Sequence, residues 1–191
     1  MQAPPKSELL RQAARYRGGF RNRPRTIDPV GPGEESVWDF PRPPVVEPVP
    51  HRLRVLLAGV TVADTQAGLR VAETAGAPVY YFPPTDVEDA YLTPVSDGAS
   101  VCEWKGLAVY HDLTVGERTS PKAAFTYPDP FDDLGQGYGR IAGWYAFYAG
   151  RVDEAWIGDV RAVPQPGGFY AGWVTPSLKG PIKGVPGSDG W

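Results

Sequence analysis

The sequence predicts an all-β protein with a short N-terminal helix and a proline-rich arm. From His51 onward, runs of β-branched and aromatic residues recur between Gly, Pro and Asp residues, at the spacing of roughly 8–12 residues typical of antiparallel β domains. Ten of the 22 prolines fall in the first 50 residues, where they favour extended chain over a packed core. Hydrophobic residues make up 42% of the 191 residues, which is enough for one buried core.

The first 50 residues are expected to form a basic helix followed by the arm. Leu and Ala recur at helical spacing over residues 7–16, and Ser7 is placed to cap that helix. Residues 23–50 are the proline-rich arm, in which Trp38 and Phe40 are the expected anchors to the body. Residues 1–25 carry seven Lys or Arg and one Glu, whereas the rest of the chain is acidic. We interpret the basic segment as a solvated face rather than a nucleic-acid site.

Residues 51–175 are expected to form the core domain, and residues 176–191 a Gly- and Pro-rich tail packed on it. Aromatic side chains near the end of the chain argue for an ordered tail. Within the core, "TDVEDAYL" predicts one short helix over 86–92, capped by Thr85 or Asp86, with Glu88 completing a capping box.

Composition excludes several classes of protein. One cysteine excludes an intrachain disulfide and a multi-cysteine zinc site, and we expect neither a metal nor a cofactor. His51 and His111 lack the partner spacing of a metal site or a catalytic triad. The chain opens on no apolar leader and has no run of about 20 apolar residues, so we expect a soluble, cytoplasmic protein without a membrane partner.

The stretch "SVCEWKGLAVYH" (100–111) contains the only cysteine. Strands are predicted on both sides of a tight connection at Lys105-Gly106, with Cys102 and Trp104 on one face because side chains alternate. A turn or bulge there would bring Lys105 next to Cys102, and a nearby ammonium favours the nucleophilic thiolate. The simpler interpretation, which we favour, is an inert thiol buried in mid-strand. Lys105 is the stronger functional candidate, since a buried lysine needs an anionic partner.

Glu73, at the end of a predicted strand, is the expected partner of Lys105 or a general base. Aromatic residues with polar tips suit pocket walls as well as β cores. We therefore expect a ligand pocket between the two sheets, with these candidate ligand-binding residues: Lys105, Glu73, Tyr81, Trp104, Tyr110 and Tyr127. The candidate catalytic residues are Cys102 and Glu73.

Five motifs occur in order over residues 51–148: "VTVADTQAGLRVAET", "PVYYFPPTDVEDAYL", "SVCEWKGLAVYH", "AAFTYPDP" and "IAGWYAFY". Together they resemble the family called domain of unknown function 427, also labelled nucleotidyltransferase-like, and the tail "GGFYAGW…GPIKGVPG…W" is similar to that of longer bacterial members. The resemblance implies a β-tent architecture, two antiparallel sheets leaning together, here without the zinc that many relatives hold through paired cysteines. No motif supports the transferase label: there is no Gly-Ser pair followed by spaced aspartates and no P-loop.

Three functions are compatible with these residues. The favoured one is a domain that binds a small, anionic molecule in a pocket around Lys105. The second is an enzyme of unknown reaction that uses Cys102 or Glu73. The third is an interaction protein that acts through its N-terminal arm, for example by forming a homodimer.

Overall fold

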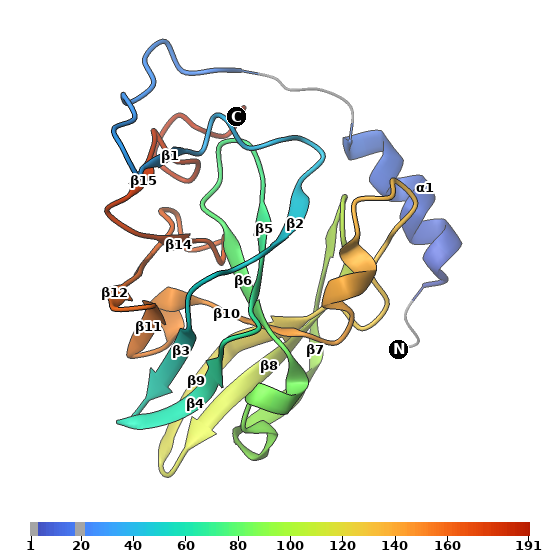
Figure 1. Cartoon of the computed structure of the whole chain (residues 1–191). Helices are drawn as coiled ribbons and strands as arrows, with labels where there is room; N and C mark the ends of the chain where they lie inside the picture. The colour runs from blue at the N-terminus through green and yellow to red at the C-terminus, as the bar shows by residue number, and fades with distance from the viewer. Residues whose placement is uncertain (1–3, 18–21) are drawn as a thin grey trace.

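The strands form two main antiparallel sheets in a computed structural model that describes residues 4–17 and 22–191 (Figure 1). The larger sheet has seven strands in the order β2 (Val45–Pro48), β5 (Leu69–Ala72), β6 (Val79–Phe82), β10 (Tyr145–Phe147), β9 (Arg118–Thr126), β8 (Gly106–Val115) and β7 (Leu92–Cys102). The smaller sheet has four, in the order β12 (Val160–Arg161), β11 (Glu154–Ile157), β3 (Leu53–Leu57) and β4 (Val60–Thr65). The predicted all-β class is confirmed, and the more specific β-tent arrangement stays a prediction.

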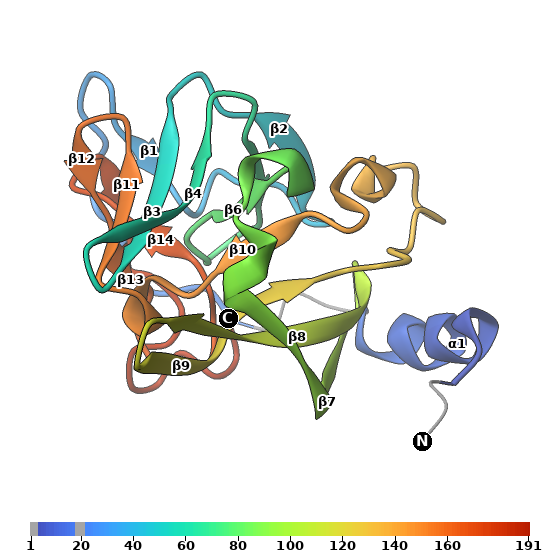
Figure 2. The same ribbon diagram turned by 90° about the horizontal axis from the view of Figure 1, so that it is seen from below.

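Short elements complete the described chain. Helix α1 spans Lys6–Tyr16, and two strand pairs join β1 (Glu35–Ser36) to β15 (Leu178–Lys179) and β13 (Val163–Pro164) to β14 (Trp173–Val174). The 3-10 helices are η1 (Pro84–Asp86), η2 (Asp89–Tyr91), η3 (Tyr138–Ile141) and η4 (Ala149–Arg151). Seen from below, β3, β4, β11 and β12 gather on one side of the molecule, and β7 and α1 lie on the other (Figure 2).

The largest hydrophobic cluster lies between the two sheets. Along β3, Leu53, Val55 and Leu57 alternate inward and are fully buried. They pack in one cluster with Phe82 of β6 and Phe147 of β10, whose rings meet edge to face at 5.5 Å between centroids. Each fully buried side chain of this size stabilises the fold by about 1.5–3 kcal/mol. We call this side of the seven-stranded sheet the inter-sheet face.

The opposite side of the same sheet is also buried, and it carries a second cluster. Because successive residues of a strand point to opposite faces, Tyr80 and Phe82 belong to the inter-sheet cluster, while Tyr81 belongs to the second one. Ala124 and Phe125 of β9 divide in the same way. We call this second side the cavity face.

Helix α1 covers part of β7 and β8. Its range agrees with the predicted 7–16, but Ser7 is not its cap: Pro5 occupies the N-cap position, and no side chain bonds to the free N–H groups. Leu9 and Ala13 are buried in a small cluster with Phe131. The helix is therefore held by packing rather than by a cap.

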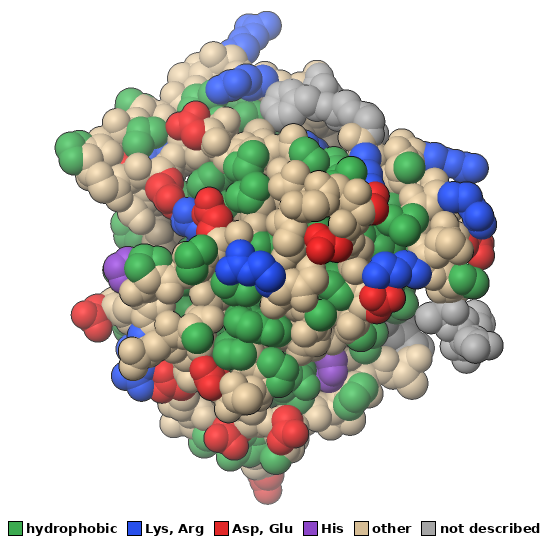
Figure 3. All heavy atoms as spheres, turned by 45° about the vertical axis from the view of Figure 1, so that its right-hand side comes forward, with side chains coloured by type: hydrophobic (Ala, Val, Ile, Leu, Met, Phe, Trp, Pro, Cys, Tyr) green, Lys and Arg blue, Asp and Glu red, His purple; other side chains and the backbone are tan. Residues whose placement is uncertain are grey.

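The basic N-terminal segment is partly neutralised by an acidic loop of the body. Lys6 pairs with Asp129, and Arg17 with Asp133, each at 2.5 Å between nitrogen and oxygen. Arg17 also donates a hydrogen bond to the Glu103 carbonyl at 2.6 Å. On the face seen in Figure 3, positive and negative side chains are interspersed rather than gathered by sign. The absence of a nucleic-acid partner stays a prediction.

The arm lies against the C-terminal segment through its predicted anchor, Trp38. This side chain is 5% exposed, and its indole N–H donates to the Pro181 carbonyl at 2.8 Å. Strand β1 of the arm pairs in parallel with β15 of the tail. Figure 1 shows that α1 lies on the opposite side of the molecule from this pair.

The predicted helix over 86–92 is wrong. The chain instead forms the two 3-10 turns η1 and η2, neither of which has a side-chain cap. Between them Val87 is extended, buried, and bridged to Ala63 of β4. Burial of this valine against the sheet overrides the local helix signal. No helix in the described part of the chain is both long enough and apolar enough to cross a membrane.

Candidate functional site

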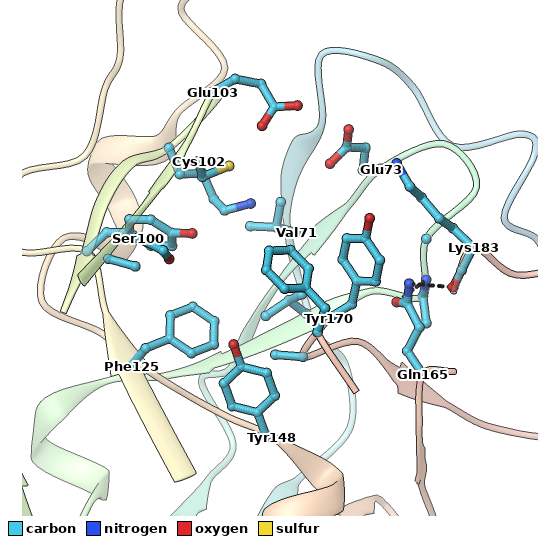
Figure 4. Close-up of a pocket in the computed structure, with 18 of the residues that line it drawn as sticks. Val71, Glu73, Ser100, Cys102, Glu103, Phe125, Tyr148, Gln165, Tyr170 and Lys183 are labelled. Carbon is cyan, nitrogen blue, oxygen red and sulfur yellow. Dashed lines mark hydrogen bonds between the residues drawn. The ribbon is translucent and has the colours of Figure 1, made fainter. Parts of the chain in front are cut away.

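A cavity of about 280 Å³ lies on the cavity face. Strands β5 to β9 supply its floor, and segments around Gln165, Tyr170 and Lys183 supply its cover. In Figure 4 the carboxylates of Glu73 and Glu103 lie at one end, with the rings of Phe125 and Tyr148 at the other. The predicted position between the two sheets is wrong, because large apolar side chains fill that space.

The hairpin of β7 and β8 brings Cys102 and Lys105 to the same cavity. Strand β7 ends at Cys102, which lies opposite Gly106, the first residue of β8. The three intervening residues form the turn. Gly106 has a φ of 96°, and a Cβ there would lie 3.2 Å from the Phe131 ring, so only glycine fits without strain. The turn therefore places the Cys102 thiol and the Lys105 ammonium in the wall of one cavity, as expected from the sequence if a turn or bulge occurred here.

Cys102 differs from the favoured expectation in its position. It is the last residue of its strand, partly exposed, and lines the cavity, rather than lying buried in mid-strand. The strand ends earlier than the sequence indicated because the chain turns directly after Cys102. The thiol is therefore not shielded from the cavity by burial.

Lys105 is buried, with 8% of its surface exposed, and lines the cavity. Among the described residues its ammonium makes no hydrogen bond and no ion pair within 4 Å. Nζ lies 5.6 Å from the centroid of the Tyr127 ring, within the range of a cation–π contact. Burial lowers the pKa of Lys105, but Cys102, Tyr81 and other acidic neighbours raise it further, so the net pKa is raised and the amine is charged at neutral pH.

Tyr81 supplies a second unpaired donor. Its side chain is fully buried and lines the cavity, and its hydroxyl has no hydrogen-bond partner. Burial raises the pKa of Tyr81 above its usual range, so it is a neutral phenol at neutral pH. The neighbouring Tyr110 differs, because its hydroxyl lies 2.8 Å from that of Ser100. Tyr127 also lines the cavity, and burial raises its pKa.

Glu73 does not form the expected ion pair with Lys105. Its carboxylate accepts a hydrogen bond from the Trp104 indole at 3.1 Å and lies 3.4 Å from the Arg42 guanidinium. Arg42 also approaches Glu103 at 3.7 Å, so one guanidinium from the arm sits between two carboxylates. Trp104, a predicted ligand-binding residue, does not line the cavity, and its indole N–H instead donates a hydrogen bond to the Glu73 carboxylate.

Sequence reasoning missed the residues that cover the cavity. Gln165 accepts a hydrogen bond from the Ala77 N–H at 3.0 Å and donates to the Lys183 carbonyl at 2.9 Å, which ties two distant segments together (Figure 4). Tyr170 follows the Gly-Gly pair of the tail and lines the same cavity. Arg42 was missed because the arm was placed outside the site. Tyr170 and Lys183 fall in the motif "GGFYAGW…GPIKGVPG…W", which carried the family resemblance but assigned no site residue.

Within the described residues, no three His, Cys, Asp or Glu side chains gather into a potential metal site. The two histidines lie outside the cavity. The absence of zinc stays a prediction that elemental analysis can test.

The fold and the site define an all-β protein with a partly enclosed cavity that contains a thiol, an unpaired ammonium and an unpaired phenol. Residues 45–158 match the family described as a domain of unknown function (DUF427), named NTP_transf_9, and the chain belongs to this family. This is the family that the five sequence motifs were predicted to indicate, so that prediction is confirmed. No curated protein matches the chain.

Proposed function

We propose that this protein binds a small organic anion in the cavity, with its negative group at Lys105. The observation that carries the proposal is the buried ammonium without a partner. Taking an ammonium out of water costs several kcal/mol unless an anion or hydrogen bonds compensate. Glu73, the expected partner, is engaged by Arg42 and Trp104 instead. A bound anion would give Lys105 the ion pair that no described residue supplies.

The cavity walls define the rest of the ligand. Phe125 and Tyr148 give an aromatic lining at the end away from the carboxylates, and Val71 adds an apolar side chain nearer to them. The volume, about 280 Å³, lies near the lower end of the roughly 300–1,000 Å³ usual for ligand pockets. The ligand is therefore compact, with an aromatic or aliphatic body and one anionic end. Glu73 and Glu103 at one end of the cavity disfavour a second negative group there.

A melting-curve screen tests the proposal. Benzoate, phenylacetate and 3-phenylpropanoate are compared with their neutral amides, using the wild type, Lys105→Met and a control, Lys179→Met. The control removes one ammonium from a residue that pairs with Glu34 away from the cavity. We expect carboxylates to raise Tm for the wild type and the control, by the amount that mass action sets. Equal stabilisation by the amides, or an unchanged response in Lys105→Met, contradicts the proposal.

The enzyme alternative has one specific observation in its favour, which is the place of Cys102 in the cavity wall. An anion held at Lys105 would lie next to this thiol. By contrast, the arm contacts its own chain: Trp38 donates to the Pro181 carbonyl, and β1 pairs with β15. No specific observation favours a homodimer formed through the arm.

A further inference from the structure

We propose that Cys102 is a nucleophile and that the ligand is a small 2-oxo acid, whose electrophilic carbon lies next to its carboxylate. This inference rests on the proposed anion binding at Lys105 and adds the chemistry that follows. Three groups of the cavity carry it: the Cys102 thiol, the Lys105 ammonium and the Tyr81 hydroxyl.

The hairpin gives the thiol access to the cavity. Figure 4 shows the Cys102 sulfur directed toward the space that Glu73, Ser100 and Tyr170 also surround. The residue is partly exposed, unlike a cysteine that serves only as core. Cys102 faces Gly106 across the hairpin, and Lys105 directly precedes Gly106, so the three-residue turn brings Lys105 to the same cavity as Cys102.

Charged groups of both signs lie around the thiol. Lys105 lines the same cavity and has no carboxylate within ion-pair distance among the described residues. Two carboxylates, Glu73 and Glu103, line the cavity as well, and Arg42 lies within 4 Å of both. Reactive cysteines are typically partly exposed and lie near a lysine, an arginine or a protonated histidine.

The two unpaired donors match two oxygen groups of one ligand. Lys105 suits the carboxylate, and the Tyr81 hydroxyl, which is fully buried without a partner, suits the adjacent carbonyl oxygen. A buried hydroxyl without a hydrogen-bond partner is costly, so an acceptor at this point removes that penalty. A carbonyl carbon between these two oxygens would lie beside Cys102, and the aromatic walls would take the side chain of the acid.

The covalent step is an addition. Cys102 Sγ attacks the carbonyl carbon, an S–C bond forms, and the C=O π bond breaks with its electron pair moving to oxygen. The proton released from the thiol is taken up by that oxygen, which gives a hemithioketal with its hydroxyl near Tyr81. No oxidant, reductant or leaving group is needed, and the step is reversible.

The first experiment measures the rate of Cys102 alkylation by iodoacetate and by iodoacetamide, followed by intact mass. Cys102 is the only cysteine, so each adduct reports on this site alone. Iodoacetate carries an electrophilic carbon next to a carboxylate, as a 2-oxo acid does, and iodoacetamide is its neutral match. The ratio of the two rates is compared with the ratio for the same protein unfolded in urea.

We expect folding to raise the iodoacetate-to-iodoacetamide ratio by at least about tenfold, because Lys105 attracts only the anionic reagent. The increase should vanish in Lys105→Met and persist in Lys179→Met. A ratio unchanged by folding overturns the inference.

The second experiment detects the adduct directly by NMR with pyruvate labelled with carbon-13 at the carbonyl. A new signal in the region of saturated carbon is expected with the wild type and not with Cys102→Ala. Cys102→Ala should still be stabilised by 3-phenylpropanoate, since Lys105 remains. If the wild type binds that anion but forms no adduct with pyruvate, the covalent inference is overturned and the proposed function stands. If neither anion stabilises the protein, both are overturned.

Discussion

The two faces of the seven-stranded sheet are built by the same strands but differ in how their polar groups are treated. On the inter-sheet face, Phe82 and Phe147 pack in one apolar cluster with the inward residues of β3. On the cavity face, the Tyr81 hydroxyl has no hydrogen-bond partner and Lys105 forms no ion pair with a described residue, around a space of about 280 Å³. One face of the sheet is therefore closed by apolar packing, whereas the other keeps polar groups around a cavity.

The largest expected effect separates two adjacent residues of β6. Phe82→Ala removes a fully buried ring that packs against Phe147 and Trp173, and should lower the free energy of unfolding by about 3–5 kcal/mol. Tyr81→Phe removes only a hydroxyl without a partner and should leave stability unchanged or raise it by about 1 kcal/mol. Urea unfolding measures both, with Phe82→Leu as a milder variant. Similar losses for Tyr81→Phe and Phe82→Ala would mean that the two faces do not differ in this way.

The next effect concerns the charge on the cavity face. Lys105→Met keeps the aliphatic stem and removes an ammonium whose charge the folded protein favours, because the pKa of Lys105 is raised, so the protein should lose about 1–3 kcal/mol of stability. Lys179→Met, which breaks a partly exposed pair with Glu34, should change stability by less than about 1 kcal/mol. A gain of stability in Lys105→Met would show that the cost of burying the ammonium outweighs its favourable contacts.

A smaller effect is expected where the arm meets the cavity. Arg42→Met leaves Glu73 and Glu103 without their shared guanidinium and should cost about 1 kcal/mol, because all three side chains are partly exposed. It should also weaken the binding of 3-phenylpropanoate, since the cavity becomes more negative. Calorimetric titration measures the affinity. Unchanged binding would place Arg42 outside the electrostatics of the site.

The smallest effect is a pH dependence on the inter-sheet face. His111 is buried there beside Tyr145, its Nδ1 has no partner, and burial lowers the pKa of His111 from its usual 6.5. The unfolded chain therefore binds a proton more readily than the folded one. The stability that the neutral ring contributes is present above about pH 6.5 and is lost as the pH falls below that value.

Urea unfolding at pH 7.5 and pH 5.5 tests this dependence. The wild type should lose up to about 1 kcal/mol more than His111→Phe between the two values. Carboxylates also make stability depend on pH, because arginine partners lower the pKa values of Asp64, beside Arg52, and of Asp133, beside Arg17. His111→Phe keeps these carboxylates, so the difference between the two proteins reports on His111 alone. Equal losses in both proteins would contradict the assignment to His111.

The sequence by itself determined the all-β class, helix α1 and the anchoring of the arm by Trp38. These features follow from local signals: short strand-like runs, helical spacing of Leu and Ala, and one large aromatic residue in a polar context. It failed over 86–92, where a helix signal competes with burial of Val87 against β4. A contact with a strand more than 20 residues away in the chain leaves no trace in a local pattern.

For the site, the sequence singled out residues, and tertiary structure decided their relations. Lys105, Tyr81 and Tyr127 were identifiable because polar or charged tips on apolar strands are rare enough to notice, and they line one cavity. The side of the sheet on which the cavity lies depends on strand register, since a shift of one residue exchanges the two faces. The partner of Glu73 is Arg42, 31 positions earlier, and only the packing of the arm brings them together. The sequence does not show this pairing, and it leaves Lys105 without an ion pair among the described residues.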